Sequence, residues 1–452
     1  MKKINLNILL FFLLIILPTY IFEVIYYLPS PTGDGVEFLK RSFSFCRHNT
    51  LTLNSSHDGG EVYVSHGWFP WYLKSILNFN CQFGFIFLFN FLLKLITIFF
   101  SFLFLKDKIY KNYLLIILFF IFVIQLKLQF RPENFVLMLT SIIFYLNDRK
   151  FYKFIPIFFA ILFNTHLVFF GFLALFFMIY FHKTYFKFKI FIESIVIFIC
   201  AIFILDIIYP HNLINYLQGN IFQNSGTWTK GSSVDIWSNF IDYYLITKIH
   251  GGGFFPLFGI IFFLTILILA KENKLFFFAI PFLYFFSLRN MPGNYYMVCL
   301  TPILLILSIN FDKKKYFKKS KAINALFLFI LFVTITGYSQ YFVKNILTIK
   351  YFKNDYENTL SFIDNNLDKI DRLPSFAYLV NDKIKLQKYE VKGCHNCNKS
   401  NSKKRYNVIE ANGNINPCPD SNLNNKDFSI KLFKKKIFNS NSSYGIYICR
   451  IN

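Results

Sequence analysis

The sequence predicts an all-α polytopic membrane protein of about eleven transmembrane helices, followed by a small α+β domain outside the membrane. Three observations predict this class. Hydrophobic residues make up 55% of the 452 positions and charged residues only 16%. Apolar runs of the kind that fill a bilayer core recur through residues 1–342. Basic residues gather in alternate connections between these runs, which is typical of cytoplasmic loops.

The apolar runs give the expected helices in chain order. The first, residues 5–28, is longer than the hydrophobic region of a signal peptide and has no small-residue cleavage site after it, which predicts an anchored helix. The later runs are 82–105, 113–127, 133–147, 154–164, 166–181, 189–208, 254–270, 275–288, 295–310 and 322–342. An odd number of spans puts the two ends of the chain on opposite sides of the membrane.

The basic clusters assign the sides, because Lys and Arg concentrate in cytoplasmic loops. They are Lys2 with Lys3; Lys106, Lys108 and Lys111; Arg149, Lys150 and Lys153; Lys183, Lys187 and Lys189; Lys271 and Lys274; and Lys313 to Lys315 with Lys318, Lys319 and Lys321. All of these connections fall on one side. The prediction is therefore a cytoplasmic N-terminus in a bacterial inner membrane, with residues 29–81 and 343–452 outside. Much of the Lys and Arg behind the net charge of +24 lies in these short loops, so no nucleic-acid partner is expected.

The tail, residues 343–452, has a different composition. Its stretch "DYENTLSFIDNNLDKI" predicts an amphipathic helix, and "SFAYLV" predicts a strand. Four of the eight cysteines crowd this domain: Cys394, Cys397, Cys418 and Cys449. In an oxidising compartment they predict two disulfides, whose pairing the sequence does not fix. A zinc site at "CHNC" is the alternative, although the matching second pair is absent. The other cysteines, Cys46, Cys81, Cys200 and Cys299, lie in the first loop or in hydrophobic positions.

The stretch "PTGDGVEF", residues 31–38, places Asp34 and Glu37 at the expected membrane edge. Ionisable groups there are costly unless they are used. Asp34 lies between two glycines, where the backbone turns freely and a bound group can approach closely. Farther along this loop, Asp58 and His66 are candidate substrate contacts, whereas His48 and Glu61 are better explained as solvated. The loop histidines have no diagnostic metal-ligand spacing, so a divalent metal stays open and no cofactor is assigned.

The outer ends of later runs carry a second group of polar residues. "LKLQFRPENF" places Lys127, Arg131 and Glu133 at the mouth of a hydrophobic helix, where a guanidinium fork suits an anion. The alternative is an Arg131 that reaches lipid headgroups and a Glu133 that favours the helix N-terminus. His166 lies at another outer junction, although a lone histidine is more often structural. "SLRNMPGNYY" adds Arg289 and Tyr295.

The order of these motifs resembles the GT-C superfamily of integral membrane glycosyltransferases. The matching features are an acid shortly after the first span, "RPE" opening the fourth, a polar junction near the sixth, and an Arg followed by aromatic residues and "LTP" at a late span. The closest likeness is to bacterial relatives of protein mannosyltransferases and aminoarabinose transferases. It covers residues 1–342 and not the tail. The family often has a second acid beside the first, and Lys where His166 stands; here Glu37 and Asp58 are not adjacent to Asp34.

The resemblance implies that a polyprenyl-phosphate sugar donates, with inversion, to a lipid, glycan or protein acceptor on the outer face. Asp34 would take the acceptor proton, and Glu133 would orient the acceptor or the cations. Arg131, Arg289 and Lys127 would stabilise the leaving phosphate. Glu37, Asp58, His66, His166 and Tyr295 would contact substrate.

Three other classes remain open from the sequence. A lipid-linked polysaccharide polymerase or ligase would be expected to have a larger outer loop richer in Arg than residues 209–253, which contain none. A transporter or flippase would place ionisable residues near the bilayer midplane, where Lys94 is the candidate. A structural membrane scaffold would leave the outer polar residues without a role.

Overall fold

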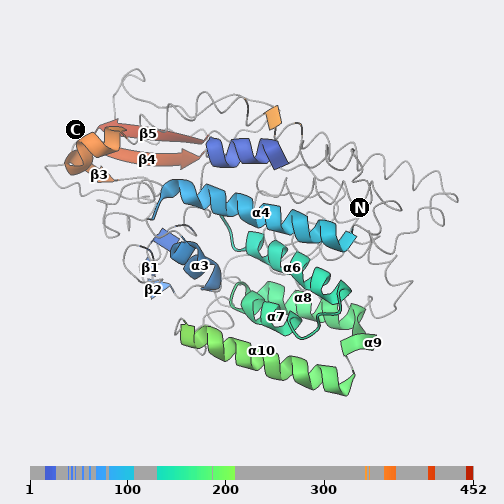
Figure 1. Ribbon diagram of the computed structural model, residues 1–452. Helices are drawn as coiled ribbons and strands as arrows, with labels where there is room; N and C mark the ends of the chain where they lie inside the picture. The colour runs from blue at the N-terminus through green and yellow to red at the C-terminus, as the bar shows by residue number, and fades with distance from the viewer. Residues whose placement is uncertain are drawn as a thin grey trace, which may run out of the picture. The chain divides into compact units, whose positions relative to one another are not determined.

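The computed structural model describes mainly helical segments together with a few short strands (Figure 1). The described residues are 16–26, 39, 42–43, 46, 53–54, 61–62, 68–77, 81–105, 130–185, 187–208, 339, 342–343, 346, 361–372, 406–412 and 444–450. They fall in two compact units. The first unit includes 16–19, 68–70, 89–105, 130–185 and 187–208. The second unit includes 20–26, 71–77, 81–88 and the described parts of the tail.

Five predicted apolar runs are confirmed as helices, with every boundary within one residue of the expected one. They are α4 (Phe83–Leu105), α6 (Glu133–Asp148), α7 (Ile155–Phe163), α8 (Leu167–Tyr180) and α10 (Phe188–Ile208). A single turn, α9 (His182–Tyr185), links the last two. The boundaries were predictable because polar or turn-forming residues interrupt each apolar run, and Pro132 stands directly before α6.

Two of these helices, α4 and α10, are long and apolar enough to cross a membrane. The 21 residues of α10 extend about 31 Å at a rise of about 1.5 Å per residue, which matches a bilayer core of about 30 Å. Helices α6, α7 and α8 have 16, 9 and 14 residues, fewer than the roughly 20 that a single span needs. The expected runs at 113–127, 254–270, 275–288 and 295–310, and all of 322–342 except residues 339 and 342, lie outside the described residues, so the total of eleven spans remains a prediction.

Aromatic side chains pack the helices of the first unit together. Phe89 of α4 contacts Phe135 near the start of α6, with ring centroids 5.8 Å apart, and Phe104 contacts Phe144 near its end at 5.7 Å. Helices α4 and α6 therefore run parallel, and the chain leaves α4 at the opposite end from where it enters α6 (Figure 1). Phe144 also meets Phe177 of α8 at 5.8 Å, so α8 runs in the same direction as α6.

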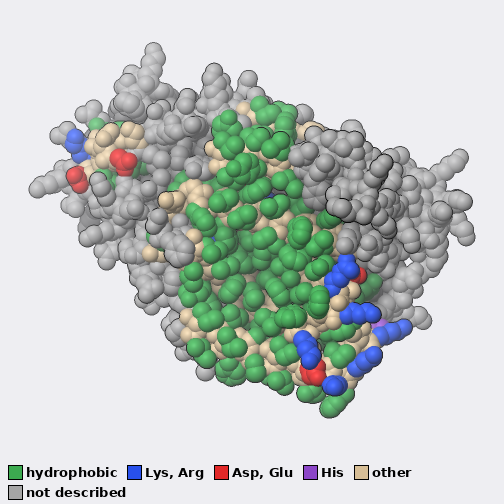
Figure 2. Space-filling model, viewed as in Figure 1, with side chains coloured by type: hydrophobic (Ala, Val, Ile, Leu, Met, Phe, Trp, Pro, Cys, Tyr) green, Lys and Arg blue, Asp and Glu red, His purple; other side chains and the backbone are tan. Residues whose placement is uncertain are grey.

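These helices give the first unit two chemically different ends. The Arg131 end consists of residues 68–69, 130–134 and 164–166, where α6 and α8 begin. The basic end consists of residues 148–154 and 181–189, where they finish and α10 begins. The 16 residues of α6 separate the two ends by about 24 Å. Figure 2 shows Lys and Arg side chains gathered at the basic end, beside a broad apolar surface.

The described part of the first predicted helix is divided between the units, with residues 16–19 in the first and 20–26 in the second. Residues 16–20 are α-helical and continue as a π-helical turn, Ile21–Ile25. Glu23 in this turn is 1% exposed, and the neighbouring Phe22 contacts Phe342 with ring centroids 5.4 Å apart. Short π-helical turns are frequent at functional sites. Glu23 is the only acid within residues 5–28, a signal that the sequence analysis did not use.

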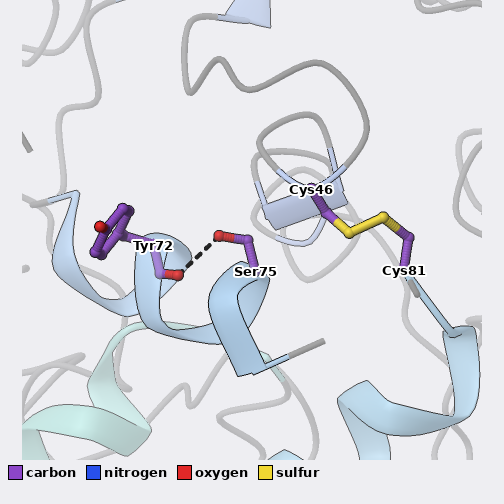
Figure 3. The surroundings of a disulfide bond; sticks show 4 residues. All are labelled: Cys46, Tyr72, Ser75 and Cys81. Carbon is purple, nitrogen blue, oxygen red and sulfur yellow. Dashed lines mark hydrogen bonds between the residues drawn. A yellow bond between two sulfur atoms is a disulfide. The ribbon is translucent and has the colours of Figure 1, made fainter. Parts of the chain in front are cut away.

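The first loop contributes a short hairpin, a helix and a disulfide to the described structure. Strand β1 (Leu53–Asn54) pairs antiparallel with β2 (Glu61–Val62), and α3 (Phe69–Leu77) follows. Cys46 is bonded to Cys81, which directly precedes α4, with 5.9 Å between the two Cα atoms (Figure 3). Disulfides persist in oxidising compartments. The placement of residues 29–81 outside the cytoplasm remains a prediction.

The tail contains a helical turn and a three-stranded sheet. Residues 361–366 are helical, as the amphipathic pattern predicted, and pass through the 3₁₀ turn Leu367–Lys369 into β3 (Ile370–Arg372). The strand order is β3, β4 (Tyr406–Asn412), β5 (Tyr444–Arg450); β3 and β4 are parallel, and β4 and β5 are antiparallel. The stretch "SFAYLV" and Cys394, Cys397 and Cys418 lie outside the described residues. Their predicted strand and disulfides, and the boundary at 343, remain predictions.

Cysteine labelling checks the disulfide against an internal control. In purified protein denatured in SDS without reductant, a maleimide should modify the free thiol of Cys200, whereas Cys46 and Cys81 should react only after reduction. Peptide mapping by mass spectrometry gives the readout for each position. Modification of Cys46 or Cys81 in unreduced protein, at the level seen for Cys200, would contradict the disulfide.

Candidate functional site

The Arg131 end contains a buried ion pair. The Nη2 atom of Arg131 lies 3.0 Å from Oε1 of Glu133, and its Nε donates a hydrogen bond to the same oxygen at 3.0 Å. The two side chains are 9% and 0% exposed. Desolvating both charges costs several kcal/mol per ion, by order of magnitude, and a buried pair is weak evidence for added stability. A buried pair at the mouth of a helix therefore suggests a function other than stabilising the fold.

Local sequence explains how this pair is held. Phe130, which is 2% exposed, has a φ of 59°, a left-handed backbone conformation that is strained for a bulky residue. Pro132 follows with helical dihedrals, and its carbonyl accepts from the amide of Phe135 at 2.9 Å. The turn thereby places Glu133 as the first residue of α6, where the helix dipole favours an acid. Arg131 is kept two residues away, within reach of that carboxylate.

His166 belongs to the same end of the unit. It is the residue before α8, with extended backbone, and only 6% of it is exposed. The imidazole of His166 lies within electrostatic range of the Arg131 guanidinium. The centroid of the imidazole ring is 4.4 Å from that of the Phe169 ring. The structure therefore brings together Arg131, Glu133 and His166, which the sequence analysis selected from two separate motifs.

Asn164 connects this end to the start of α3. Its Oδ1 accepts a hydrogen bond from Nε1 of Trp68 at 3.1 Å, and its backbone carbonyl accepts from the amide of Phe69 at 3.2 Å. Its own Nδ2 donates to the carbonyl of Ala160 at 3.0 Å, which fixes the amide orientation. Trp68 is 1% exposed. Trp68 and Phe69 of the first loop are thus bonded to Asn164, two positions before His166.

A second asparagine pair joins α4 to α6 beside the ion pair. Nδ2 of Asn134 donates to Oδ1 of Asn90, and both side chains are buried. Asn134 directly follows Glu133 in the first turn of α6. Buried polar groups are costly unless they are hydrogen-bonded, and a satisfied pair fixes one arrangement of the two helices. The Asn90–Asn134 bond therefore holds the start of α6, and with it Glu133, against α4.

This arrangement suits the binding of an anion rather than the transport of a charge. A guanidinium offers five N–H donors in a planar fork that matches phosphate and carboxylate oxygens. Glu133 and Asn134 orient the segment that carries it, and burial strengthens electrostatic interactions with a group that enters. The pair lies where α6 begins and not at its midpoint, whereas the coupling sites of transporters lie near the bilayer midplane.

Seven other predicted site residues lie outside the described residues: Asp34, Glu37, Asp58, His66, Lys127, Arg289 and Tyr295. Their roles remain predictions. Asn164, Trp68, Asn90 and Asn134 were not predicted as site residues. A polar residue next to a selected histidine, and asparagines inside long apolar runs, were the available signals.

No protein-family model, curated protein or solved structure matches the chain. Among the residues that the structure describes, no three His, Cys, Asp or Glu side chains are grouped as metal ligands. His48, His57 and His66 of the first loop lie outside that part of the chain.

A double-mutant cycle tests the connection between Trp68 and Asn164. Trp68→Phe removes the indole donor, and Asn164→Ala removes its acceptor, so each should reduce the free energy of unfolding by about 1–3 kcal/mol. The coupling energy between them should be about 1 kcal/mol, because both remove the same hydrogen bond. Thermal unfolding in detergent gives the readout.

A matched cycle provides the control for that measurement. Tyr185→Phe removes a hydrogen bond at the opposite end of the unit. Its effect should add to that of Asn164→Ala within about 0.5 kcal/mol, because the sites share no partner. Simple additivity of Trp68→Phe with Asn164→Ala would contradict the described connection.

Proposed function

We propose that this chain is an integral membrane glycosyltransferase of the GT-C type. It moves a sugar from a polyprenyl-phosphate donor to an acceptor on the outer face of the membrane, with inversion. The observation that carries the proposal is the buried Arg131–Glu133 pair at the end of the first unit opposite the basic end. Helices α4 and α10 have the length and composition of membrane spans.

The proposed sidedness follows from the charge distribution. The positive-inside rule assigns the basic end, with its lysines and Arg149, to the cytoplasm. The Arg131 end then faces the opposite side. Separately, the Cys46–Cys81 disulfide favours an oxidising compartment for the first loop. Both inferences agree on the placement of the first loop, and they rest on independent residues. Lipid-linked sugars presented on that side would reach Arg131 from the membrane.

The proposed chemistry gives each residue a separate task. Arg131 binds the donor phosphate and stabilises the negative charge that develops on it as the glycosidic bond breaks. Glu133 orients the guanidinium through its 3.0 Å contacts, and His166 lines the same end. Asp34 takes the proton from the acceptor hydroxyl as that oxygen bonds to the anomeric carbon. The leaving group is already an anion, so it requires positive charge more than a general acid.

A donor panel tests the proposal. Purified protein would be incubated with polyprenyl-phosphate sugars and candidate acceptors, and release of the sugar-free carrier phosphate would be measured. The proposal predicts release with at least one donor, and its loss in Arg131→Met. Equal release in that variant would exclude Arg131 from the site. If no donor in the panel released carrier, whereas uptake of a lipid or solute into proteoliposomes was observed, a transporter would replace the glycosyltransferase.

A further inference from the structure

The basic end carries more cationic side chains than its own acids neutralise. They are Arg149, Lys150, Lys153, Lys183, Lys187 and Lys189, defined here as the basic surface. Asp148 is 3.8 Å from Nε of Arg149, whose guanidinium also lies 5.7 Å from the Tyr145 ring. Arg149 therefore interacts within the protein, and the five lysines are exposed. Glu193 is the other acid of this region, one helical turn after Lys189.

The two segments that form the basic surface are held together by a buried tyrosine. The hydroxyl of Tyr185 donates to Oδ1 of Asn147 at 3.1 Å, and its ring lies 5.9 Å from that of Tyr152. Burial, and to a smaller extent Tyr152, raise the pKa of Tyr185, so its hydroxyl stays protonated and remains a donor. Lys150 and Lys153 on one segment are thereby kept close to Lys183 and Lys187 on the other.

An exposed apolar stripe runs along α10 from the basic surface. It comprises Phe188, Ile192, Ile195, Ile199, Phe203 and Ile207, and each of these side chains is at least 39% exposed. Their spacing of three or four residues places them on one face of the helix. Phe151 and Phe154, 50% and 54% exposed, lie among the lysines. Aromatic residues at this level are typical of the membrane interface.

We propose that the basic surface and the α10 stripe together bind an anionic phospholipid. The lipid phosphate would lie among the lysines and an acyl chain along α10. Juxtamembrane lysines attract anionic lipids, and an exposed apolar helix face provides the area that an acyl chain covers. The charge and the apolar stripe adjoin each other on one unit, which matches the two halves of a phospholipid. This inference does not depend on the proposed glycosyltransferase activity.

Lipid retention tests the inference on the whole protein. Purified protein would be equilibrated with equal amounts of phosphatidylglycerol and phosphatidylcholine, and the bound lipids counted by native mass spectrometry. Phosphatidylglycerol should be preferred. The preference should fall by about tenfold or more when Lys150, Lys153, Lys183 and Lys187 are all changed to Gln. The matched variant with Arg at the same four positions should keep it.

Ionic strength provides a second test that needs no variant. At about 1 M salt the screening length falls to about 3 Å, so the preference of the unmodified protein for phosphatidylglycerol should largely disappear. Three results would each overturn the inference. They are an unchanged preference for phosphatidylglycerol in the Gln variant, loss of that preference in the Arg variant, and its full persistence in high salt.

Discussion

Asp34→Asn should lower turnover of the donor by about 10²-fold or more, with donor binding retained. The asparagine keeps the size of the side chain and its hydrogen bonding but cannot accept the acceptor proton. Donor binding should survive, because the proposed phosphate contacts come from Arg131. Transfer would be followed as release of carrier phosphate, and binding as retention of the sugar-free carrier.

Glu37→Gln is the matched control for this variant, since it removes a negative charge three residues away in the same loop. A residue that only decorates the loop should tolerate the change. A role for Asp34 in insertion or solubility predicts similar behaviour of both variants, because a neutral residue at a membrane edge is no harder to insert. Near-normal transfer by well-folded Asp34→Asn would remove Asp34 as the base and make Glu133 the next candidate.

Arg131→Lys should lower donor turnover by about tenfold to a hundredfold while the protein still folds. Lysine keeps the positive charge but loses the planar fork that contacts Glu133 and, by the proposal, the phosphate. The matched control is Arg149→Lys, at an arginine whose side chain is 34% exposed and pairs with Asp148 at 3.8 Å. Exposed pairs of this kind contribute about 0–1 kcal/mol, so that variant should resemble the unmodified protein. Equal kinetics in the two variants would exclude Arg131 from the phosphate site.

Removing the pair in two steps separates stability from function. Arg131→Met alone leaves a buried carboxylate without its ion-pair partner and should reduce the free energy of unfolding by about 3–5 kcal/mol. Adding Glu133→Leu should restore most of that stability, because an apolar pair of similar volume can replace buried charges. Activity should not return. Recovery of transfer in the double variant would show that the pair serves the fold alone.

The helices α4, α6, α7, α8 and α10 were predictable to within one residue because their information is local. For α10, an apolar run of spanning length follows Lys187 and Lys189. For α6, Pro132 lacks a backbone N–H, and the helix dipole favours an acid such as Glu133 in the first turn, so these two residues mark where the helix begins. Arg131 and Glu133 are two residues apart, so their interaction was also visible as a local pattern. The expectation that α7 forms a complete span is less secure, because its nine residues extend only about 14 Å, about half of a bilayer core.

The contacts that assemble the site were not predictable, because they join residues far apart in the sequence. Trp68 bonds to Asn164 across 96 positions, and Asn90 bonds to Asn134 across 44. Cys46 and Cys81 are separated by 35 residues, and nothing in their spacing distinguishes a pair from two buried thiols. The strained backbone at Phe130 likewise results from the packed structure around it. Tertiary packing decides each of these features, and the sequence supplies only the residue types.

Photocrosslinking tests the central claim, that the Arg131 end binds the lipid-linked phosphate. A sugar-free polyprenyl phosphate with a photoreactive group in its first isoprene unit would be irradiated with the protein in excess phosphatidylglycerol, which occupies the basic surface. The account predicts crosslinks within residues 130–135 and 164–170, strongly reduced in Arg131→Lys and unchanged in Arg149→Lys. Crosslinks confined to residues 148–154 and 181–189, or an unchanged pattern in Arg131→Lys, would contradict it.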